Sequence, residues 1–129
     1  CMQKSKILVV DDSKTYLAFA TAALEDAGYT VIQSQDIWIS RQIRTECPDL
    51  ILMDVSLGPS KGTCAVSAVK KWNFSTGIKI FLHSAESAET LSELARDCGA
   101  DGFIRKDGSA QQLARKVSSA LVENKRLGF

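Results

Sequence analysis

Several apolar runs of this chain end within two residues of a side chain that could take part in phosphoryl transfer. Together these positions supply carboxylates, a hydroxyl and an ammonium group. The runs and the side chains after them are 7–10 with Asp11 and Asp12, 50–53 with Asp54, 78–82 with Ser84, and 101–104 with Lys106. Closely spaced acids repel one another, and a bound cation relieves that repulsion. If the runs converge, they predict a divalent metal ion, a carboxylate nucleophile and a site for a phosphoryl group.

The elements that must position these side chains are visible in the hydrophobic pattern. Continuous runs of Val, Ile and Leu are typical of strands that are covered on both faces. Such strands are predicted near 6–10, 30–34, 50–53, 78–82 and 101–104. In an open parallel sheet, ligands bind outside the carboxyl ends of the strands, so the polar side chains would share one edge.

The segments between the strands have helical periodicity and helix-boundary residues. The first helix is predicted from Ser13 as N-cap to Ala27, with Leu17, Ala20, Leu24 and Ala27 on one stripe, and Gly28 stops it. The second starts near Asp36 as cap, carries Ile39 and Ile43 inward and ends at Pro48; the third follows Gly62 and carries Ala65, Val69 and Trp72. The fourth follows Ser87, carries Leu91, Leu94 and Ala95 and ends at Gly99; the fifth follows Ser109, with Leu113, Val117 and Leu121.

Five strands that alternate with five helices predict an α/β doubly wound fold. Right-handed crossovers leave few topologies for such a chain. With the strand order 2-1-3-4-5, the first strand lies beside the third. Asp11, Asp12 and Asp54 then meet at the point where the strand order reverses.

Length and composition indicate one ordinary globular domain. The 129 residues are 45% apolar and 24% charged, with a net charge of +1. A balanced charge without a basic block disfavours non-specific binding of nucleic acid. No window approaches the roughly 18 apolar residues of a membrane span. The four scattered cysteines favour separate thiols in a reducing cytosol, so we expect a cytoplasmic location and no membrane partner.

This pattern closely resembles the receiver domain of bacterial two-component response regulators, of the chemotaxis-Y-like kind, from Lys6 to about Val122. The resemblance rests on an acid pair after the first strand, Asp after the third, Ser after the fourth and Lys after the fifth. It implies a flavodoxin-like (βα)5 sandwich with a parallel five-stranded sheet. It also implies a signalling phosphoacceptor that promotes its own phosphorylation and dephosphorylation, rather than an enzyme.

By this resemblance, Asp54 is the phosphoacceptor and Mg²⁺ is the cofactor. Asp11 and Asp12 correspond to the acids that hold the metal ion, together with Asp54 and the backbone carbonyl of Ser56. Lys106 corresponds to the cation that pairs with Asp54 and then with a phosphoryl oxygen. Further correspondences are Ser84 as the hydroxyl that moves to the phosphoryl group, Phe103 as the aromatic switch, and Gly62 as the glycine after the phosphorylation loop.

The sequence departs from the family at two loops. Leu57-Gly58-Pro59 replaces the usual Met-Pro after the phosphoacceptor, so the conformation there is not predicted. Asp107 follows Lys106 where relatives commonly have a proline after a cis peptide. A non-proline cis bond costs about 2.5–4 kcal/mol, so we expect a trans bond between Lys106 and Asp107. The extra carboxylate of Asp107 is expected to weaken the pairing of Lys106.

Simpler interpretations exist for single residues. Asp12 and Ser84 could each be only a helix cap, Lys106 a solvated lysine, and Phe103 a packed aromatic. His83, the one histidine, is better explained as a packed or hydrogen-bonded residue than as a general base. Two other functions remain open: an enzyme of the haloacid-dehalogenase-like phosphatase kind, and a degenerate receiver used as a scaffold. The first lacks its Asp-x-Asp motif here.

The expected partners follow from the resemblance. A sensor histidine kinase or a histidine phosphotransferase would supply the phosphoryl group. An effector would bind the face formed by the fourth helix, fifth strand and fifth helix, and a homodimer on phosphorylation is a further possibility. Residues 1–129 are predicted to form a single receiver domain, with no output domain inside the chain.

Overall fold

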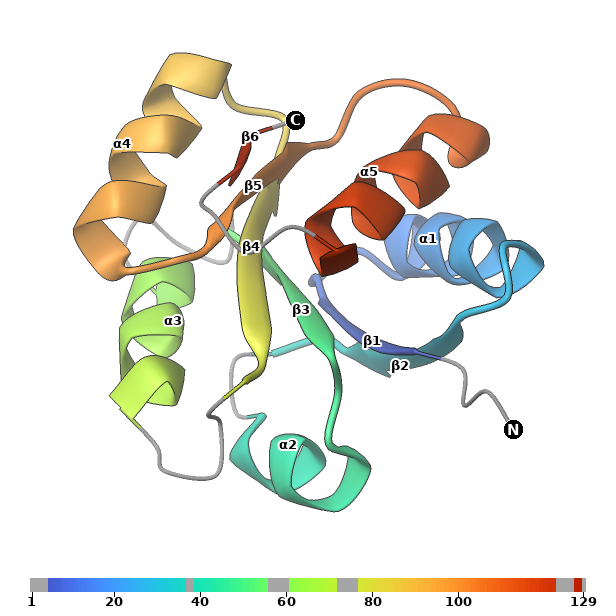
Figure 1. Ribbon diagram of the computed structural model, residues 1–129, viewed down its shortest axis with the longest axis horizontal. Helices are drawn as coiled ribbons and strands as arrows, with labels where there is room; N and C mark the ends of the chain where they lie inside the picture. The colour runs from blue at the N-terminus through green and yellow to red at the C-terminus, as the bar shows by residue number, and fades with distance from the viewer. Residues whose placement is uncertain (1–4, 37–38, 56–60, 72–76, 123–126, 129) are drawn as a thin grey trace.

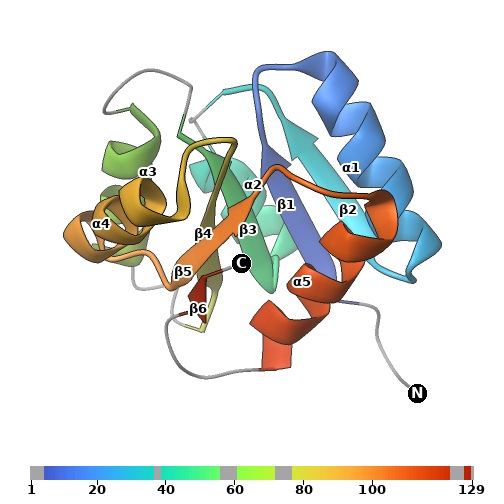
Figure 2. The ribbon, with the colours of Figure 1, turned by 90° about the horizontal axis from the view of Figure 1, so that it is seen from above.

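A parallel sheet between two layers of helices makes up the fold (Figures 1 and 2). The computed structural model describes residues 5–36, 39–55, 61–71, 77–122 and 127–128. The strands are β1 (Lys6–Val10), β2 (Thr30–Ser34), β3 (Leu50–Asp54), β4 (Lys79–Ser84), β5 (Gly102–Arg105) and β6 (Leu127–Gly128). The helices are α1 (Lys14–Asp26), α2 (Ser40–Glu46), α3 (Lys61–Lys71), α4 (Ala88–Cys98) and α5 (Ala110–Val122).

The strand order confirms the predicted topology and adds one strand to it. The sheet runs β2-β1-β3-β4-β5-β6, and every neighbouring pair is parallel. The sequence did not indicate β6, which pairs Gly102 with Leu127 and Phe103 with Gly128. A strand of two residues is too short to show a hydrophobic period, so the pattern could not reveal it.

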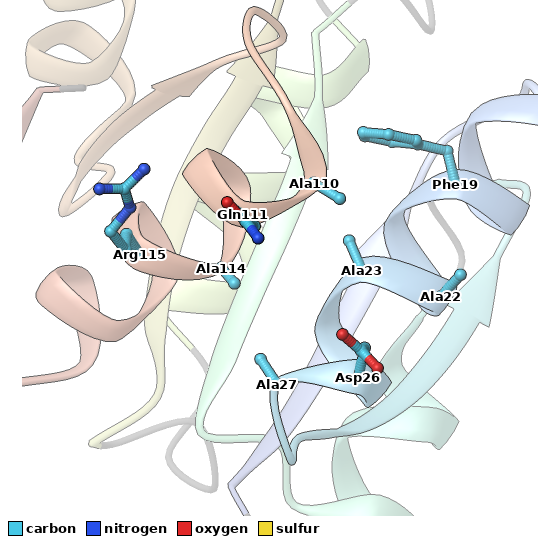
Figure 3. A pocket seen from close by; sticks show the side chains of 9 residues that line it. All are labelled: Phe19, Ala22, Ala23, Asp26, Ala27, Ala110, Gln111, Ala114 and Arg115. Carbon is cyan, nitrogen blue, oxygen red and sulfur yellow. The ribbon is translucent and has the colours of Figure 1, made fainter.

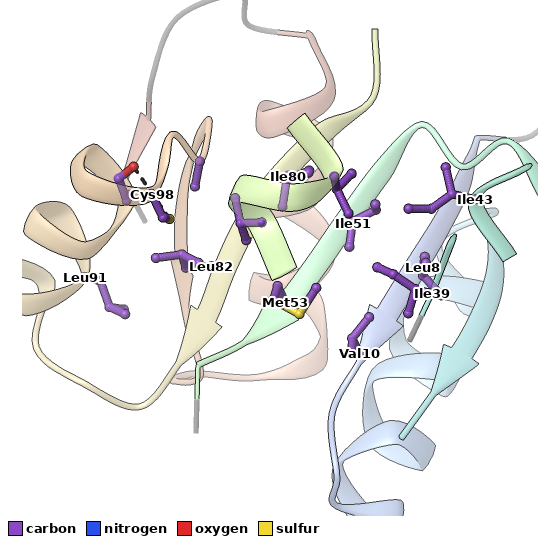
Figure 4. Close-up of a cluster of buried hydrophobic side chains, with 14 residues drawn as sticks. Leu8, Val10, Ile39, Ile43, Ile51, Met53, Ile80, Leu82, Leu91 and Cys98 are labelled. Carbon is purple, nitrogen blue, oxygen red and sulfur yellow. Dashed lines mark hydrogen bonds between the residues drawn. The ribbon is translucent and has the colours of Figure 1, made fainter. Parts of the chain in front are cut away.

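Each face of the sheet has its own hydrophobic core, because successive side chains of a strand point to opposite faces. From β1, Leu8 and Val10 join the cluster under α2, α3 and α4, which Figure 4 shows. Ile7 and Val9 join the cluster under α1 and α5 on the other face. Figure 2 shows α1 and α5 together on one side of the sheet and α3 and α4 on the other. This double coverage explains why the strands are continuous apolar runs.

The first helix begins where its cap predicts and ends one residue early. The Ser13 Oγ accepts a hydrogen bond from the Tyr16 backbone N–H at 3.1 Å, so Ser13 rather than Asp12 is the N-cap. The helix ends at Asp26, which leaves Ala27 exposed instead of on the buried stripe. Ala23 takes that place in the core.

The second helix begins later than the sequence predicted. Its N-cap is Ile39, which makes no side-chain capping bond, so the assignment of Asp36 as the cap was wrong. Ile39 and Ile43 are both fully buried, as expected. Burial of these two side chains decides where the helix lies, and that outweighs the local preference for a polar cap. Cys47, with a φ of 49°, ends the helix before Pro48.

The remaining helices match their predicted boundaries closely. Helix α4 follows its N-cap Ser87 and ends at Gly99, whose φ of 81° is a conformation that glycine adopts readily. Helix α5 begins directly after Ser109. Helix α3 starts at Lys61, slightly before the predicted position. Val69 is buried there as expected, whereas Trp72 and the side chain of Ala65 lie outside what the structure describes.

Candidate functional site

The strand register brings the predicted site residues to one edge of the sheet. Asp11 follows β1 directly, and Asp54 is the last residue of β3. Asp54 lies opposite His83 in the register, so Ser84 at the end of β4 extends one residue further. The backbone N–H of Lys106 donates to the Ser84 carbonyl oxygen at 2.8 Å, which ties the loop after β5 to the same edge.

Three carboxylates form the centre of this edge. Asp11, Asp12 and Asp54 each offer an oxygen atom, and these atoms all lie within 4.8 Å of one another. Asp11 and Asp54 are each 1% exposed, whereas Asp12 is exposed. An all-oxygen donor set that opens to water on one side is what Mg²⁺ requires, because the ion keeps several waters. These residues therefore fit a magnesium ion.

Lys106 supplies the positive charge inside the acid cluster. Its ammonium group forms an ion pair with the Asp11 Oδ2 and lies 3.5 Å from the Asp54 Oδ1. The Lys106 side chain is only 16% exposed, so water screens these contacts weakly. In this structure the lysine is therefore shared between two acids, with Asp11 the nearer one.

Burial dominates the electrostatics of Asp11. Loss of water raises the pKa of its carboxyl group, and the charge of Asp54 raises it further. The ammonium of Lys106 and the Ser13 backbone N–H, which donates to the Asp11 Oδ1 at 2.9 Å, lower the pKa and offset part of this effect. The net increase shows that one lysine does not compensate the buried acids fully. An additional cation would stabilise the charged form.

Ser84 and Phe103 lie on the other half of the site. Ser84 is 4% exposed, and its Oγ accepts a hydrogen bond from the Glu86 backbone N–H at 3.1 Å. Phe103 is half-buried and packs against the core cluster under α4. Its ring also lies close to the β6 backbone, because a β-carbon at Gly128 would come within 2.4 Å of a ring carbon. Only glycine therefore fits at position 128 with the ring where it is.

His83 is a packed, hydrogen-bonded residue, in agreement with the simpler interpretation of the sequence. It is 1% exposed, and its Nδ1 donates to the Ile104 carbonyl oxygen at 2.7 Å. Its Nε2 therefore accepts from the Tyr16 hydroxyl, 2.5 Å away. Burial lowers the pKa of His83 to about 4, and burial also raises the pKa of Tyr16. Both side chains are neutral near pH 7.

Tyr16 is the site residue that the sequence reasoning missed. Its ring lies beneath the Lys106 ammonium, with 4.6 Å between Nζ and the ring centroid. The available signal was the capping residue Ser13, because it fixes the start of α1 and places Tyr16 in the first turn beside the strand ends. Nothing in the pattern of apolar residues distinguishes this aromatic side chain from an ordinary core residue.

The loop after Lys106 differs from one expectation and agrees with another. The Asp107 carboxylate pairs with Lys116 at 2.6 Å and with Arg105 at 3.2 Å, rather than with Lys106. The Lys116 contact holds the pKa of Asp107 below its ordinary value. The expected weakening of Lys106 by this acid therefore has no basis in the contacts. The bond between Lys106 and Asp107 is trans, as predicted.

The features predicted for the chain after β3 are described only in part. Ser56 and the segment 57–59 are outside the described residues, and Gly62 lies within α3. A concavity of about 720 Å³ lies between α1 and α5 (Figure 3), and none of the three acids lines it. Its lining is mostly apolar, with Phe19 and Ala23 on one helix and Ala110 and Ala114 on the other.

Fold and site together define a class of signalling protein. Residues 7–118 match the response regulator receiver domain, and the chain belongs to that family. It is thus a receiver domain of two-component response regulators, a class of signalling phosphoacceptors rather than enzymes. The phosphatase alternative is not favoured.

Individual relatives support this assignment. The chain is 32% identical to the Bacillus subtilis alkaline phosphatase synthesis transcriptional regulatory protein PhoP, over 90% of this chain and 48% of PhoP. It is 26% identical to PilH of Pseudomonas aeruginosa, over 91% of this chain and 98% of PilH. The chemotaxis response regulator CheY4 of Vibrio cholerae has the same fold, with a TM-score of 0.83 at 24% identity, covering 92% of this chain and all of CheY4 (100%).

The relatives differ in how much of their length this chain represents. It spans about half of several curated transcriptional regulators that it matches, 51% of one and 48% of another.

Among the residues that the structure describes, no helix has the length and apolar character to cross a membrane.

Proposed function

We propose that Asp54 is the residue that accepts the phosphoryl group. The observation that carries this assignment is its placement: a carboxylate 1% exposed, within 4.8 Å of two other acids and 3.5 Å from the Lys106 ammonium. A carboxylate in such a position is an activated nucleophile once cations balance the surrounding negative charge. Asp11 and Asp12 are the residues that would hold Mg²⁺ beside it.

In the proposed reaction, an Asp54 carboxylate oxygen attacks the phosphorus of a phosphohistidine. The new P–O bond forms an acyl phosphate as the P–N bond to the imidazole breaks, and the imidazole keeps that electron pair. Bound Mg²⁺ would supply positive charge to the phosphoryl oxygens. Lys106 neutralises another phosphoryl oxygen, which requires its ammonium to move away from Asp11. The domain thereby promotes its own phosphorylation and, with water as the nucleophile, its dephosphorylation.

The response to phosphorylation begins with Ser84. Its oxygen accepts a hydrogen bond from the Glu86 backbone N–H in this structure, so its own O–H can still donate to a phosphoryl oxygen. A phosphoryl group adds about −1.5 to −2 charge and strong acceptors, which favours movement of the Ser84 hydroxyl toward it. Inward movement of Ser84 opens space for Phe103 to turn, and this changes the face formed by α4, β5 and α5. We propose that an effector reads that face.

The partners proposed for this domain follow from its class. A sensor histidine kinase or a histidine phosphotransferase donates the phosphoryl group, and an effector or a second copy of the domain binds α4–β5–α5 after phosphorylation. The near-neutral charge of +1 argues against direct binding of nucleic acid by this segment. We place the domain in the cytoplasm, as one unit over residues 1–129.

The assignment of Asp54 is tested by labelling with a small phosphodonor. With Mg²⁺ and acetyl phosphate, the intact mass of the wild type should increase by one phosphate, and Asp54→Asn should show no increase. Asp107→Asn is the matched control, because that acid lies in the loop after β5, next to Lys106, but is bound to Lys116 and Arg105. Labelling of the Asp54→Asn variant at the wild-type level would contradict the assignment.

The response is tested separately by backbone amide shifts on addition of beryllofluoride, which imitates a phosphoryl group. The proposal expects changes at Asp54 and Ser84 and also at Phe103 and along α4. Changes confined to the neighbourhood of Asp54 would show that the α4–β5–α5 face does not respond.

A further inference from the structure

Lys106 rests on an aromatic ring that belongs to a different element. The Tyr16 ring projects from the first turn of α1, and the Lys106 ammonium lies 4.6 Å from its centroid. We infer that Tyr16 is the positioning residue for Lys106 and that its hydroxyl bond to His83 holds the ring in that role. This inference rests on the proposed function of Lys106 at Asp54.

A lysine in this position needs a support because its own side chain is flexible. The ammonium ends a stem of four carbons, and three rotatable donors impose little directionality. Asp11 and Asp54 compete for this ammonium group and lie at unequal distances from it. An electron-rich ring face within about 6 Å attracts a cation, and the attraction grows when water is excluded. The side chain of Lys106 is 16% exposed, so the ring contact operates in a partly dry site.

The ring is fixed in relation to the strand that carries the lysine. The Tyr16 hydroxyl is 2.5 Å from the His83 Nε2, and the His83 Nδ1 is 2.7 Å from the carbonyl oxygen of Ile104. Ile104 lies on β5, two residues before Lys106, which directly follows the strand. The contacts therefore close a loop from Lys106 through the ring, the imidazole and the Ile104 carbonyl back to the lysine backbone.

This closed loop defines what Tyr16 contributes to the reaction. A lysine without the ring would follow the nearer carboxylate, Asp11, and would reach Asp54 less often. With the ring beneath it, the ammonium stays between the two acids, where the transferred phosphoryl group arrives. Tyr16 thus acts through Lys106 and does not itself contact the reacting atoms.

Substitution of the ring tests the inference in the full chain. Tyr16→Leu should slow labelling of Asp54 by acetyl phosphate by roughly 3- to 30-fold, the range expected for loss of a partly desolvated cation–ring contact. Tyr16→Phe keeps the ring but loses the hydroxyl bond to His83, so its rate should lie between those of the wild type and Tyr16→Leu. Tyr29→Leu is the control, because Tyr29 is also partly buried against the core under α1 and α5. A Tyr16→Leu rate within twofold of the Tyr29→Leu rate would overturn the inference.

A double-mutant cycle with Lys106→Met separates positioning from a general structural effect. If Tyr16 acts through the lysine, Tyr16→Leu should have no further effect on the rate in the Lys106→Met background. An equal reduction in both backgrounds overturns the inference. Urea unfolding checks that each variant is folded, and Tyr16→Met replaces Tyr16→Leu if the latter does not unfold cooperatively. Labelling of the wild type at a residue other than Asp54 would instead contradict the proposed function.

Discussion

The two halves of the site differ in how complete they are. The acid half, at the ends of β1 and β3, already has its carboxylates together, within 4.8 Å of one another. The responding half, at the ends of β4 and β5, has its groups engaged elsewhere. Ser84 accepts from Glu86, and Lys106 is paired with Asp11 as well as Asp54. The acids are therefore assembled in advance, whereas the response requires the Ser84 hydroxyl to move and Lys106 to leave Asp11.

The two halves also differ in the charge that they bury. The acid half accumulates negative charge, and the raised pKa of Asp11 shows that it is only partly balanced. The responding half instead buries a neutral pair, Tyr16 and His83, directly beside the lysine. A cation stabilises the first arrangement, whereas a proton on the imidazole would disrupt the second.

The largest expected effect is on stability in mild acid. His83 has an ordinary pKa of 6.5 in the unfolded chain and of about 4 in the fold. Between these values the unfolded chain binds more protons, so the free energy of unfolding falls as the pH falls. The difference of about 2.5 in pKa corresponds to about 3 kcal/mol, fully present above pH 6.5 and lost by about pH 4.

Urea unfolding of the wild type and of His83→Gln over pH 4 to 7 measures this effect. The raised pKa of Asp11 acts in the opposite direction, because the folded state then retains a proton more readily. Since Asp11 is present in both proteins, the difference between them isolates the imidazole. A His83→Gln variant that loses as much stability as the wild type over this range would show that His83 is not the responsible group.

A smaller effect is expected on the affinity of the acid half for Mg²⁺. Lys106 competes with Mg²⁺ for Asp11, so Lys106→Met should raise the affinity for the ion. A unit charge a few ångströms away at an intermediate dielectric is consistent with an increase of about tenfold. Isothermal titration with MgCl₂ gives the affinity. Lys70→Met is the control, since Lys70 pairs with Asp101 at 2.5 Å outside the site, and it should leave the affinity unchanged.

An unchanged or lower affinity for Mg²⁺ in Lys106→Met would show that the lysine does not compete for the acids. Removal of Asp11 by Asp11→Asn should act in the opposite direction. Loss of even an outer-shell partner reduces metal affinity about 10- to 100-fold, so loss of this buried acid should reduce it by at least that factor.

The acid half was also the half that the sequence predicted best. Its residues follow apolar runs that predict strands. The end of each strand in the sequence therefore predicts that the acid there lies at the edge of the sheet. Asp11 and Asp54 were therefore placed correctly from the pattern alone. Right-handed crossovers limited the possible topologies, and the predicted strand order was confirmed by the pairing of β1 with β3.

The responding half was predicted only in outline, because its details depend on packing between elements. The Tyr16 contact with His83 joins residues 67 positions apart, and no local preference encodes it. Asp107 was expected to weaken the pairing of Lys106. Its carboxylate instead forms an ion pair with Lys116, which lies on α5. The same limit applies to two other elements. Burial of Ile39, rather than a capping residue, decides where α2 begins, and pairing with β5, rather than a hydrophobic period, decides where β6 forms.

A smaller effect is expected from Ser84→Ala. Loss of the hydrogen bond from the Glu86 backbone should lower the free energy of unfolding by about 1 kcal/mol. Labelling of Asp54 should persist, because the acid half is intact, but the beryllofluoride shifts near Phe103 should disappear. Ser87→Ala is the matched control, since it removes the Thr90 bond at 3.2 Å that caps α4. It should cost similar stability and keep those shifts.

Retention of the Phe103 shifts in Ser84→Ala would show that Phe103 responds to beryllofluoride without the Ser84 hydroxyl. The proposed connection between the two halves through Ser84 would then be wrong. Loss of the shifts in Ser87→Ala as well would trace them to α4 stability rather than to the Ser84 hydroxyl.

The smallest effect belongs to Asp107, at the outer end of the responding half. Its carboxylate is largely exposed, and its bonds to Lys116 and Arg105 are surface ion pairs. Such pairs contribute about 0.2–1 kcal/mol each and weaken as salt screens them. Asp107→Asn should therefore lower the free energy of unfolding by less than about 1 kcal/mol at low ionic strength. The difference from the wild type should vanish in about 1 M NaCl.

The pH dependence of this small difference has a definite sign. Lys116 lowers the pKa of Asp107 in the fold, so the contribution is present above the ordinary carboxyl pKa of 3.8 and is lost as the pH falls below it. In a Lys116→Met background the Asp107→Asn change should lose most of its effect. The rate of Asp54 labelling should be the same in Asp107→Asn, in Lys116→Met and in the wild type, because Asp107 does not pair with Lys106. A faster rate in Asp107→Asn would mean that this carboxylate does draw the lysine away, and that the loop weakens the site.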